Sequence, residues 1–444
     1  MTDITHEASV NHASDNHGLQ FVVQQSYPTL CQISVFIPKN LVDACYHEAT
    51  LSQRTITEAH GFEKGNVPLK YIQENYKSNL DEHVKEFLFH YFVTDFLYSQ
   101  IYEKKLLVAG EPRLQEIHCE SGKEAQFDFE LSLCAPVAMQ EWKYLPFKAP
   151  KRKNYKDLDR QVEAFINDEQ ENEKKNKTTS LEVGDWVNFT VALVDNNHQP
   201  IFGSHRANVW LKLGDEEADA PLTDVFLGKA ISDSFYASEP SIQNFFTSHL
   251  ETSYLFLIEI QDILKSTYFC FDSFKKHFKL KTNKELYQKL IEVFSYRNDL
   301  SQRRSMAGEA LALLLSKHRF VVPSSLVLRQ QKEILDFLQT NPDYHVYRTQ
   351  KDFKERVHQL AEKQACEMIL LDQLAYHENI MVTNQDVKYY LNLINRPRTK
   401  EFIYFDPTIT KVFGQEIPLA SEELKRICLR EKTLNHIIYH LTKK

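Results

Sequence analysis

The stretch FVVQQSYPTLCQISVFIPKNLVDACYHEATLSQRTITEA, residues 21–59, decides the fold class of the amino-terminal part of this chain. Residues 20–37 alternate apolar and polar side chains, which is typical of half-buried strands. From residue 41 the spacing changes, and Leu41, Cys45 and Ala49 recur on one face of a helix. Strands followed directly by a helix predict an α+β domain.

The next apolar segments extend this domain. The run EFLFHYFVTDFLY, residues 86–98, is too short to span a bilayer and is interrupted by His90 and Asp95. It predicts a buried aromatic helix over about 80–103. The alternating segment at 127–137 then reads as a further strand.

Length, charge and cysteine content limit the possible classes of protein. At about 150 residues per domain, 444 residues predict roughly three domains. The hydrophobic fraction of 42% is enough for globular cores, and the net charge of -8 gives no overall attraction to nucleic acid or to an anionic membrane. The seven cysteines are dispersed without a CxxC pair, which favours free thiols over disulfides or a zinc site.

The remainder of the chain divides by composition. Residues 181–263 are rich in β-branched and aromatic side chains separated by turns, and beyond about 270 the spacing becomes helical. We predict a multidomain α+β protein with these parts: a flexible amino terminus (1–18), an α+β domain (19–149), a charge-rich linker helix (150–178), a small β domain (179–264) and an all-α domain (265–444).

Several helical faces in the last part are apolar. TNQD at 383–386 predicts a capping box that opens a helix ending before Pro397. A second set of residues with helical spacing is Val357, Ala361, Ala365, Met368 and Leu371, and a wider apolar set includes Leu326, Leu328, Ile334 and Phe337. Such faces usually form core, so the pattern assigns no binding role to them.

Three ordered blocks carry a resemblance to a known family. They are GFEKGNVP at 61–68, SKHRFVVPSSLVLRQ at 316–330 and QACEMILLDQLAYHENIMVTNQDV at 364–387. Together they resemble bacterial trigger factor, the ribosome-associated chaperone, over nearly the whole chain from residue 20. The first block is similar to the GFRxGKxP signature of the family's ribosome-docking tip.

The resemblance implies a cytoplasmic, partly ribosome-bound, ATP-independent chaperone. Its implied partners are the ribosome, through exit-site protein and rRNA, and nascent or unfolded polypeptides, with no membrane, DNA, metal or cofactor. The implied ribosome-binding residues are Gly61, Phe62, Glu63, Lys64, Gly65 and Asn66. Glu63 and Asn66 replace two cations of the signature, so we expect weaker docking or greater reliance on ribosomal protein. Nearby cations that remain are Lys64, Lys70 and Lys77.

The resemblance also implies that residues 179–264 form an FKBP-like peptidyl-prolyl isomerase domain. Twisting an X-Pro bond requires only a dry aromatic cradle with hydrogen-bond donors. The candidate pocket residues are Phe189, Phe202, Leu222, Phe226, Phe245, Phe246 and Tyr254. Leu222 stands where the family carries an aromatic residue, so the pocket motif is degraded, and these rings could equally be ordinary core.

Other chemistries find little support. The chain has no GxxxxGK phosphate loop and no GxSxG elbow, and HIIYH at 436–440 lacks the glutamate of HExxH. Three hypotheses remain: a chaperone docked at the ribosome, a prolyl isomerase whose flanking domains recruit substrate, and a scaffold without either activity. Aggregation assays on a chain lacking 181–263 would separate the first two.

Overall fold

The computed structural model describes most of the chain. The described residues are 18–27, 30–134, 137–139, 141–151, 157–176, 178–248, 250, 254–297, 299–339, 341–406, 411–412 and 414–443. Apart from Gly18, the predicted flexible terminus of residues 1–18 lies outside them.

An antiparallel sheet of order β1-β2-β4-β3 forms the base of the amino-terminal module. Its strands are β1 (Gln20–Tyr27), β2 (Leu30–Ile37), β3 (Arg113–His118) and β4 (Ala125–Ser132). Alternate side chains of β2 and β4 are buried, and Val35 lies opposite Phe127 in the register. The predicted strand pair and following helix are therefore confirmed.

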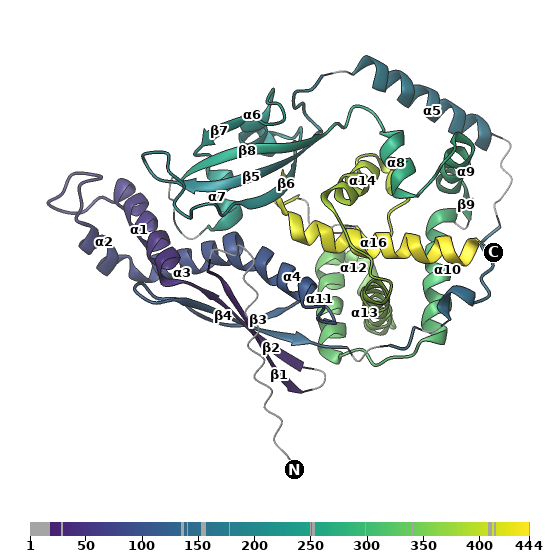
Figure 1. The fold of residues 1–444 in the computed structure, drawn as a ribbon, viewed down its shortest axis with the longest axis horizontal. Coiled ribbons are helices and arrows are strands. Elements are labelled where there is room, and N and C mark those ends of the chain that lie inside the picture. Colours follow the sequence, from purple (N-terminus) through teal and green to yellow (C-terminus); the bar gives the residue numbers. More distant parts are fainter. Residues whose placement is uncertain are drawn as a thin grey trace, which may run out of the picture.

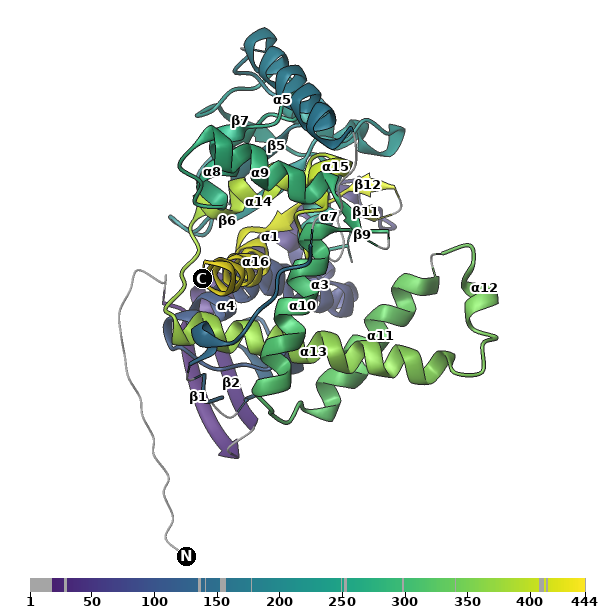
Figure 2. The same ribbon diagram turned by 90° about the vertical axis from the view of Figure 1, so that its right-hand side faces the viewer.

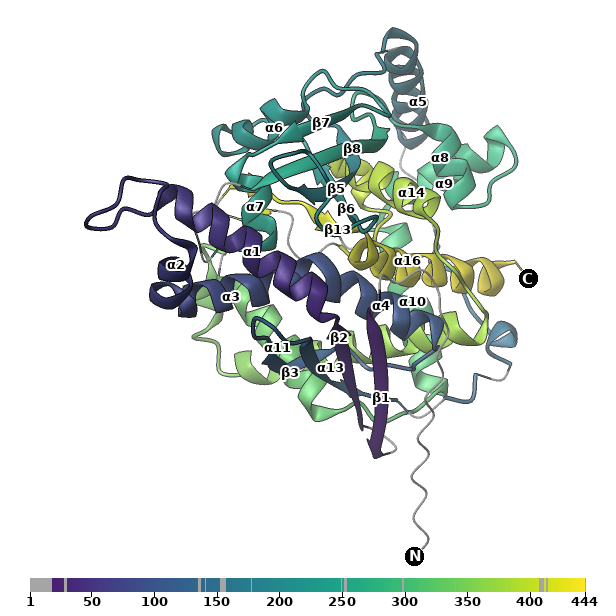
Figure 3. The same cartoon turned by 60° about the vertical axis from the view of Figure 1, so that its left-hand side comes forward.

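Helices cover one face of this sheet (Figure 3). They are α1 (Lys39–Ile56), α2 (Leu69–Asn75), α3 (Lys77–Leu88), the π-helical turn η1 (Phe89–Val93) and α4 (Thr94–Glu103). The helix predicted over 80–103 is thus interrupted by a π turn, a feature frequent at functional sites. In the described parts of the chain, every helix is too short or too polar to cross a bilayer.

The β module is a five-stranded sheet of order β13-β6-β5-β8-β7. The strands are β5 (Trp186–Val194), β6 (Ala207–Lys212), β7 (Ser234–Ala237), β8 (Leu255–Leu264) and β13 (Leu419–Ala420). The short helices η3 (Glu217–Asp219), α6 (Ala220–Phe226) and α7 (Pro240–Phe246) accompany them.

One strand of this sheet comes from far along the chain. Leu419 of β13 pairs with Trp210 of β6, although the predicted boundaries put residue 419 in the all-α domain. The preceding hairpin of β11 (Lys411–Val412) and β12 (Gln415–Glu416) also returns to the β module, because the Glu416 N–H donates to Asp219 Oδ1 at 2.6 Å. A boundary at 264 therefore does not separate the two parts.

The helical part surrounds α16 (Ser421–Thr442), which crosses the centre of the molecule (Figure 1). Around it lie α8 (Phe271–His277), α9 (Asn283–Phe294), α10 (Gln302–Lys317), α14 (Asn384–Ile394), α15 (Pro397–Lys400), η2 (Trp142–Tyr144) and the short pair β9 (Tyr296–Arg297) and β10 (Leu300–Ser301). The predicted capping box of Thr383 and Asp386 is confirmed at α14.

Two further elements complete the helical part. The expected linker helix is α5 (Leu158–Lys175), which buries Leu158 and Val162 against the helical core. Helices α11 (Ser324–Gln339), α12 (Tyr344–Tyr347) and α13 (Phe353–His377) form an arm that extends from the body (Figure 2). Val327, Ile334, Val357 and Ala361 form a small core inside this arm.

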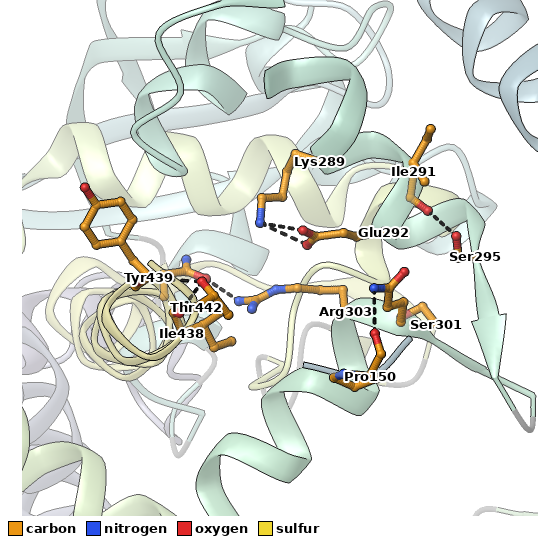
Figure 4. A network of polar contacts seen from close by, with 12 residues as sticks. Pro150, Lys289, Ile291, Glu292, Ser295, Ser301, Arg303, Ile438, Tyr439 and Thr442 are labelled. Atoms are coloured by element: carbon orange, nitrogen blue, oxygen red, sulfur yellow. Dashed lines mark hydrogen bonds and ion pairs between the residues drawn. The ribbon is translucent and has the colours of Figure 1, made fainter. Parts of the chain in front are cut away.

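A buried arginine fixes α10 against α16 (Figure 4). Arg303 is 2% exposed and donates to Asn435 of α16, while its Nε has no partner among the described residues. On the neighbouring α9, Lys289 and Glu292 form an ion pair at 2.9 Å. A buried charge held in this way is sensitive to geometry, so it favours one packing of the two helices.

Candidate functional site

The loop between α1 and α2 carries the predicted docking residues and extends from the end of the amino-terminal module (Figure 3). Phe62 is 45% exposed, and its ring centroid lies 6.4 Å from that of Tyr71. The neighbouring Glu63 and Lys64 are exposed as well. The tip therefore offers an accessible aromatic side chain at the end of a helical projection.

Backbone geometry explains the two glycines of this tip. Gly61 has φ +87° and Gly65 has φ +82°, a region that L side chains rarely adopt. Between them the Phe62 N–H donates to the Ala59 carbonyl at 3.0 Å. The Arg54 Nε donates to the Gly65 carbonyl at 2.9 Å, which ties the loop to α1. The loop is thus a defined turn that presents Phe62.

The charges at the tip nearly cancel. Lys64 lies 3.8 Å from Glu58, and the Asn66 side chain donates to Glu63 at 3.4 Å. With Glu63 in place of a cation, the tip has little net positive charge for phosphate. Contact through the apolar ring of Phe62 is therefore the stronger feature of this surface.

A cavity of about 1430 Å³ lies between the amino-terminal module, the β module, the arm and α16. Its apolar lining comprises Phe89, Leu222, Phe245, Leu326, Leu360, Met368, Phe405, Ile417, Leu419 and Ile427. Charged side chains are interspersed, among them Glu111, Arg329, Glu333, Lys363, Glu367, Glu423, Arg426 and Arg430. A concave surface of this mixed kind, partly open to solvent, can accept apolar and polar parts of a chain segment together.

Glu111 holds three of these walls together. Its carboxylate accepts from Tyr98 of α4 at 2.5 Å and pairs with Arg426 of α16. Its carbonyl accepts from Arg329 of the arm at 2.7 Å. Although burial opposes ionisation, the two arginines Arg426 and Arg430 lower the pKa of Glu111. Glu111 carries no signal in the sequence, because no motif joins positions so far apart in the chain.

The predicted prolyl pocket does not form one open cradle. Phe189 and Phe226 lie inside the β module with their ring centroids 4.6 Å apart, and both are buried. Leu222 and Phe245 line the large cavity instead. The remaining three rings, Phe202, Phe246 and Tyr254, are buried and face α3 and η1.

The apolar arm residues divide in a similar way. Leu326, Ile334 and Leu371 are buried and Met368 lines the cavity, whereas Leu328 is 63% and Phe337 is 73% exposed. Helical spacing could not distinguish these cases, because the arm has core on one side and exposed side chains such as Leu328 on the other.

The HIIYH histidines pack rather than project into solvent. The ring of His436 lies 5.8 Å from that of Trp142, and its Nε2 is 3.4 Å from Glu378. His440 is also 5.8 Å from Trp142. The pair therefore connects α16 to η2 and the end of α13.

Taken together, these features define a multidomain binding protein with an exposed aromatic tip and a large, partly open cavity of mixed polarity. Models of the family described as "Bacterial trigger factor protein (TF)" match residues 19–168 and, for its C-terminus, residues 282–438. The chain belongs to the trigger factor family, a family of chaperones.

Individual relatives are distant but cover nearly the full length. Trigger factor of Rickettsia massiliae is 23% identical over 438 residues, covering 96% of this chain and 92% of that protein. Trigger factor of Geobacter metallireducens is 21% identical, covering 92% and 94%. A solved structure titled "Promiscuous Substrate Recognition in Folding and Assembly Activities of the Trigger Factor Chaperone" is 13% identical, with a TM-score of 0.36 and coverage of 94% and 99%.

Proposed function

We propose that this protein is a cytoplasmic, ATP-independent chaperone that docks on the ribosome through the Phe62 tip and holds nascent polypeptides in its central cavity. The observation that carries the docking proposal is the exposed ring of Phe62 on a turn fixed by Gly61 and Gly65. An exposed aromatic side chain on a rigid turn is a suitable anchor for a protein surface.

Docking is tested by cosedimentation of the purified full chain with ribosomes over a salt series. Changing Phe62→Ala together with Lys64→Ala should weaken binding roughly tenfold or more, a loss of about 1.4 kcal/mol per factor of ten. The matched control is Tyr236→Ala with Lys229→Ala, which removes an exposed ring and a cation from the β module. Unchanged binding by the tip variant would exclude this loop as the anchor.

The client site we propose is the cavity of which Glu111 is a lining residue. Its volume of about 1430 Å³ accommodates a short unfolded segment rather than a folded domain. Many shallow apolar contacts, each worth about 25 cal/mol per Å² buried, would hold such a segment reversibly without nucleotide hydrolysis.

Client binding is tested by suppression of aggregation of an unfolded protein. Leu360→Lys with Met368→Lys puts two charges into the cavity lining and should reduce suppression at equal chaperone concentration. The control Leu300→Lys with Ile231→Lys changes two exposed apolar residues outside the cavity lining. Equal loss in both variants would mean that the cavity is not the client site.

A second candidate function is prolyl isomerisation by the β module. It is favoured by the grouping of Phe202, Phe246 and Tyr254, whose ring centroids all lie within 6.2 Å of that of Phe87. Deletion of 181–263, as the sequence alone suggests, would not test it cleanly, because the hydrophobic core of the β module is continuous with that of the amino-terminal module. Point variants of the full chain are therefore needed to test isomerisation.

If neither docking nor aggregation suppression nor isomerisation is detected, the scaffold hypothesis remains. In that case the exposed arm residues Leu328 and Phe337 would be the first surface to vary.

A further inference from the structure

Helix α3 and the π turn η1 lie directly on the aromatic side of the β module. The ring of Phe87 lies 5.6 Å from Phe246 and 5.6 Å from Tyr254. Tyr91 lies 5.3 Å from Phe202, and Phe92 lies 5.0 Å from the same ring in an edge-on arrangement. Phe87, Tyr91 and Phe92 are each 1% exposed or less, so the contact excludes water.

Polar groups align this contact. His83 Nε2 is 2.7 Å from the Tyr254 hydroxyl, and His83 Nδ1 is 3.2 Å from the Thr247 hydroxyl. The Tyr91 hydroxyl donates to the Val191 carbonyl of β5 at 3.1 Å. Buried polar groups that pair across the contact define one relative position of the two surfaces.

From these contacts we infer that the segment 83–92 is a built-in cover, which keeps a prolyl-binding aromatic face of the β module closed in the resting chain. The inference rests on the second function proposed above. The rings that would surround a proline are Phe202, Phe246 and Tyr254, and all three are already in contact with the cover. A peptide can reach them only after the two modules separate.

The contact between segment 83–92 and the β module can be weakened by changing residues of segment 83–92 alone. Phe89, between Phe87 and Tyr91, turns away and packs on Phe127 and Phe129 of the sheet at 6.2 and 6.3 Å. The helix therefore has separate faces for the sheet and for the β module. Removing Phe87 and Tyr91 changes the second face without altering any side chain of the proposed prolyl site.

The test uses the full chain and a protease-free isomerisation assay on a Phe-Pro tetrapeptide. The opened variant is Phe87→Ala with Tyr91→Ala, and His83→Ala is a milder alternative should the double variant fail to fold. The control is Phe127→Ala, which removes a buried ring from the same module on the sheet side. Hydrogen exchange in α7 and β8 reports whether the cover has opened.

We expect the wild-type chain to isomerise the peptide at close to the uncatalysed rate. The opened variant should be at least tenfold faster and should show faster hydrogen exchange in α7 and β8. The control variant should behave like wild type in both measurements. Wild-type activity equal to that of the opened variant would overturn the proposal that segment 83–92 is a cover, while leaving the proposed isomerase function intact. Faster exchange without activity would overturn both the cover and the isomerase function. Equal activation of the Phe127→Ala control would mean that any loss of core packing activates the protein, and would also overturn the proposal of a cover.

Discussion

The phenol oxygen of Tyr254 lies 2.7 Å from Nε2 of His83, where the β module meets α3 and both side chains are buried. The two residues are 171 positions apart in the chain. Because the Thr247 hydroxyl faces the other ring nitrogen at 3.2 Å, the imidazole has a polar neighbour at both ends. This arrangement joins two modules that the sequence pattern predicts as separate domains.

Loss of the Tyr254 hydroxyl should destabilise the whole chain. Tyr254→Phe removes the hydroxyl that lies 2.7 Å from the buried His83 Nε2, at a cost of about 1–3 kcal/mol in the free energy of unfolding. Urea unfolding of wild type and variant measures this difference in the free energy of unfolding. Tyr144→Phe, at a side chain that is 79% exposed, is the matched control and should change little. Equal effects would show that the hydrogen bond contributes nothing specific.

Gly110 should be intolerant of a side chain because the arm packs on it. A Cβ there would lie 2.2 Å from Leu326 Cδ1, and its φ is +84°. Gly122 has a nearly identical φ of +86° but open space around it. Gly110→Ala should therefore cost about 1–3 kcal/mol more than Gly122→Ala in chemical unfolding. Similar costs would mean that Leu326 moves aside freely.

Asp95 should make the protein more stable below neutral pH than above it. Burial, and next the negative charge of Glu422, raise the pKa of Asp95 to about 7. The folded state thus favours the protonated carboxyl, and this contribution is lost as the pH rises from about 4, the unfolded value, to about 7.

The variant Asp95→Asn stays uncharged and isolates this effect. Its free energy of unfolding should exceed that of wild type by ~1–2 kcal/mol at pH 8, and the gain should shrink at pH 5. Asp336→Asn on the exposed face of α11 serves as control. A gain independent of pH would refute the assignment to the Asp95 charge.

Restoring the missing cations should strengthen ribosome binding. Glu63→Arg with Asn66→Lys adds two positive charges to an exposed loop and removes one negative charge. Binding should become tighter at low salt, and the slope of log K against log salt should steepen by about 1–2. Glu173→Arg with Gln170→Lys on α5 makes the same change in net charge elsewhere. If this control binds equally well, the effect is one of overall charge only.

Local features of this protein were accessible from the sequence. Alternation in residues 20–37 gave β1 and β2, Thr383 and Asp386 gave the start of α14, and the glycines at 61 and 65 gave an exposed turn. These features depend on neighbours within a few residues, where side-chain spacing and backbone preference are decisive.

The contacts between modules were not accessible in this way. Leu419 completes a sheet whose other strands end at residue 264, and Phe87 covers rings that the family resemblance would leave open. Glu111 joins α4, the arm and α16 around a cavity lined from positions 89 to 430.

The sequence by itself therefore determined local elements such as β1, β2 and the start of α14, and the turn at the exposed tip, because the responsible interactions are local. Only the tertiary structure decided which apolar faces are buried and which line the cavity. It also decided which aromatic rings of segment 83–92 pack on those of the β module. An apolar side chain such as Phe246 can lower its free energy against any suitable surface, and the surface it meets depends on how distant segments pack.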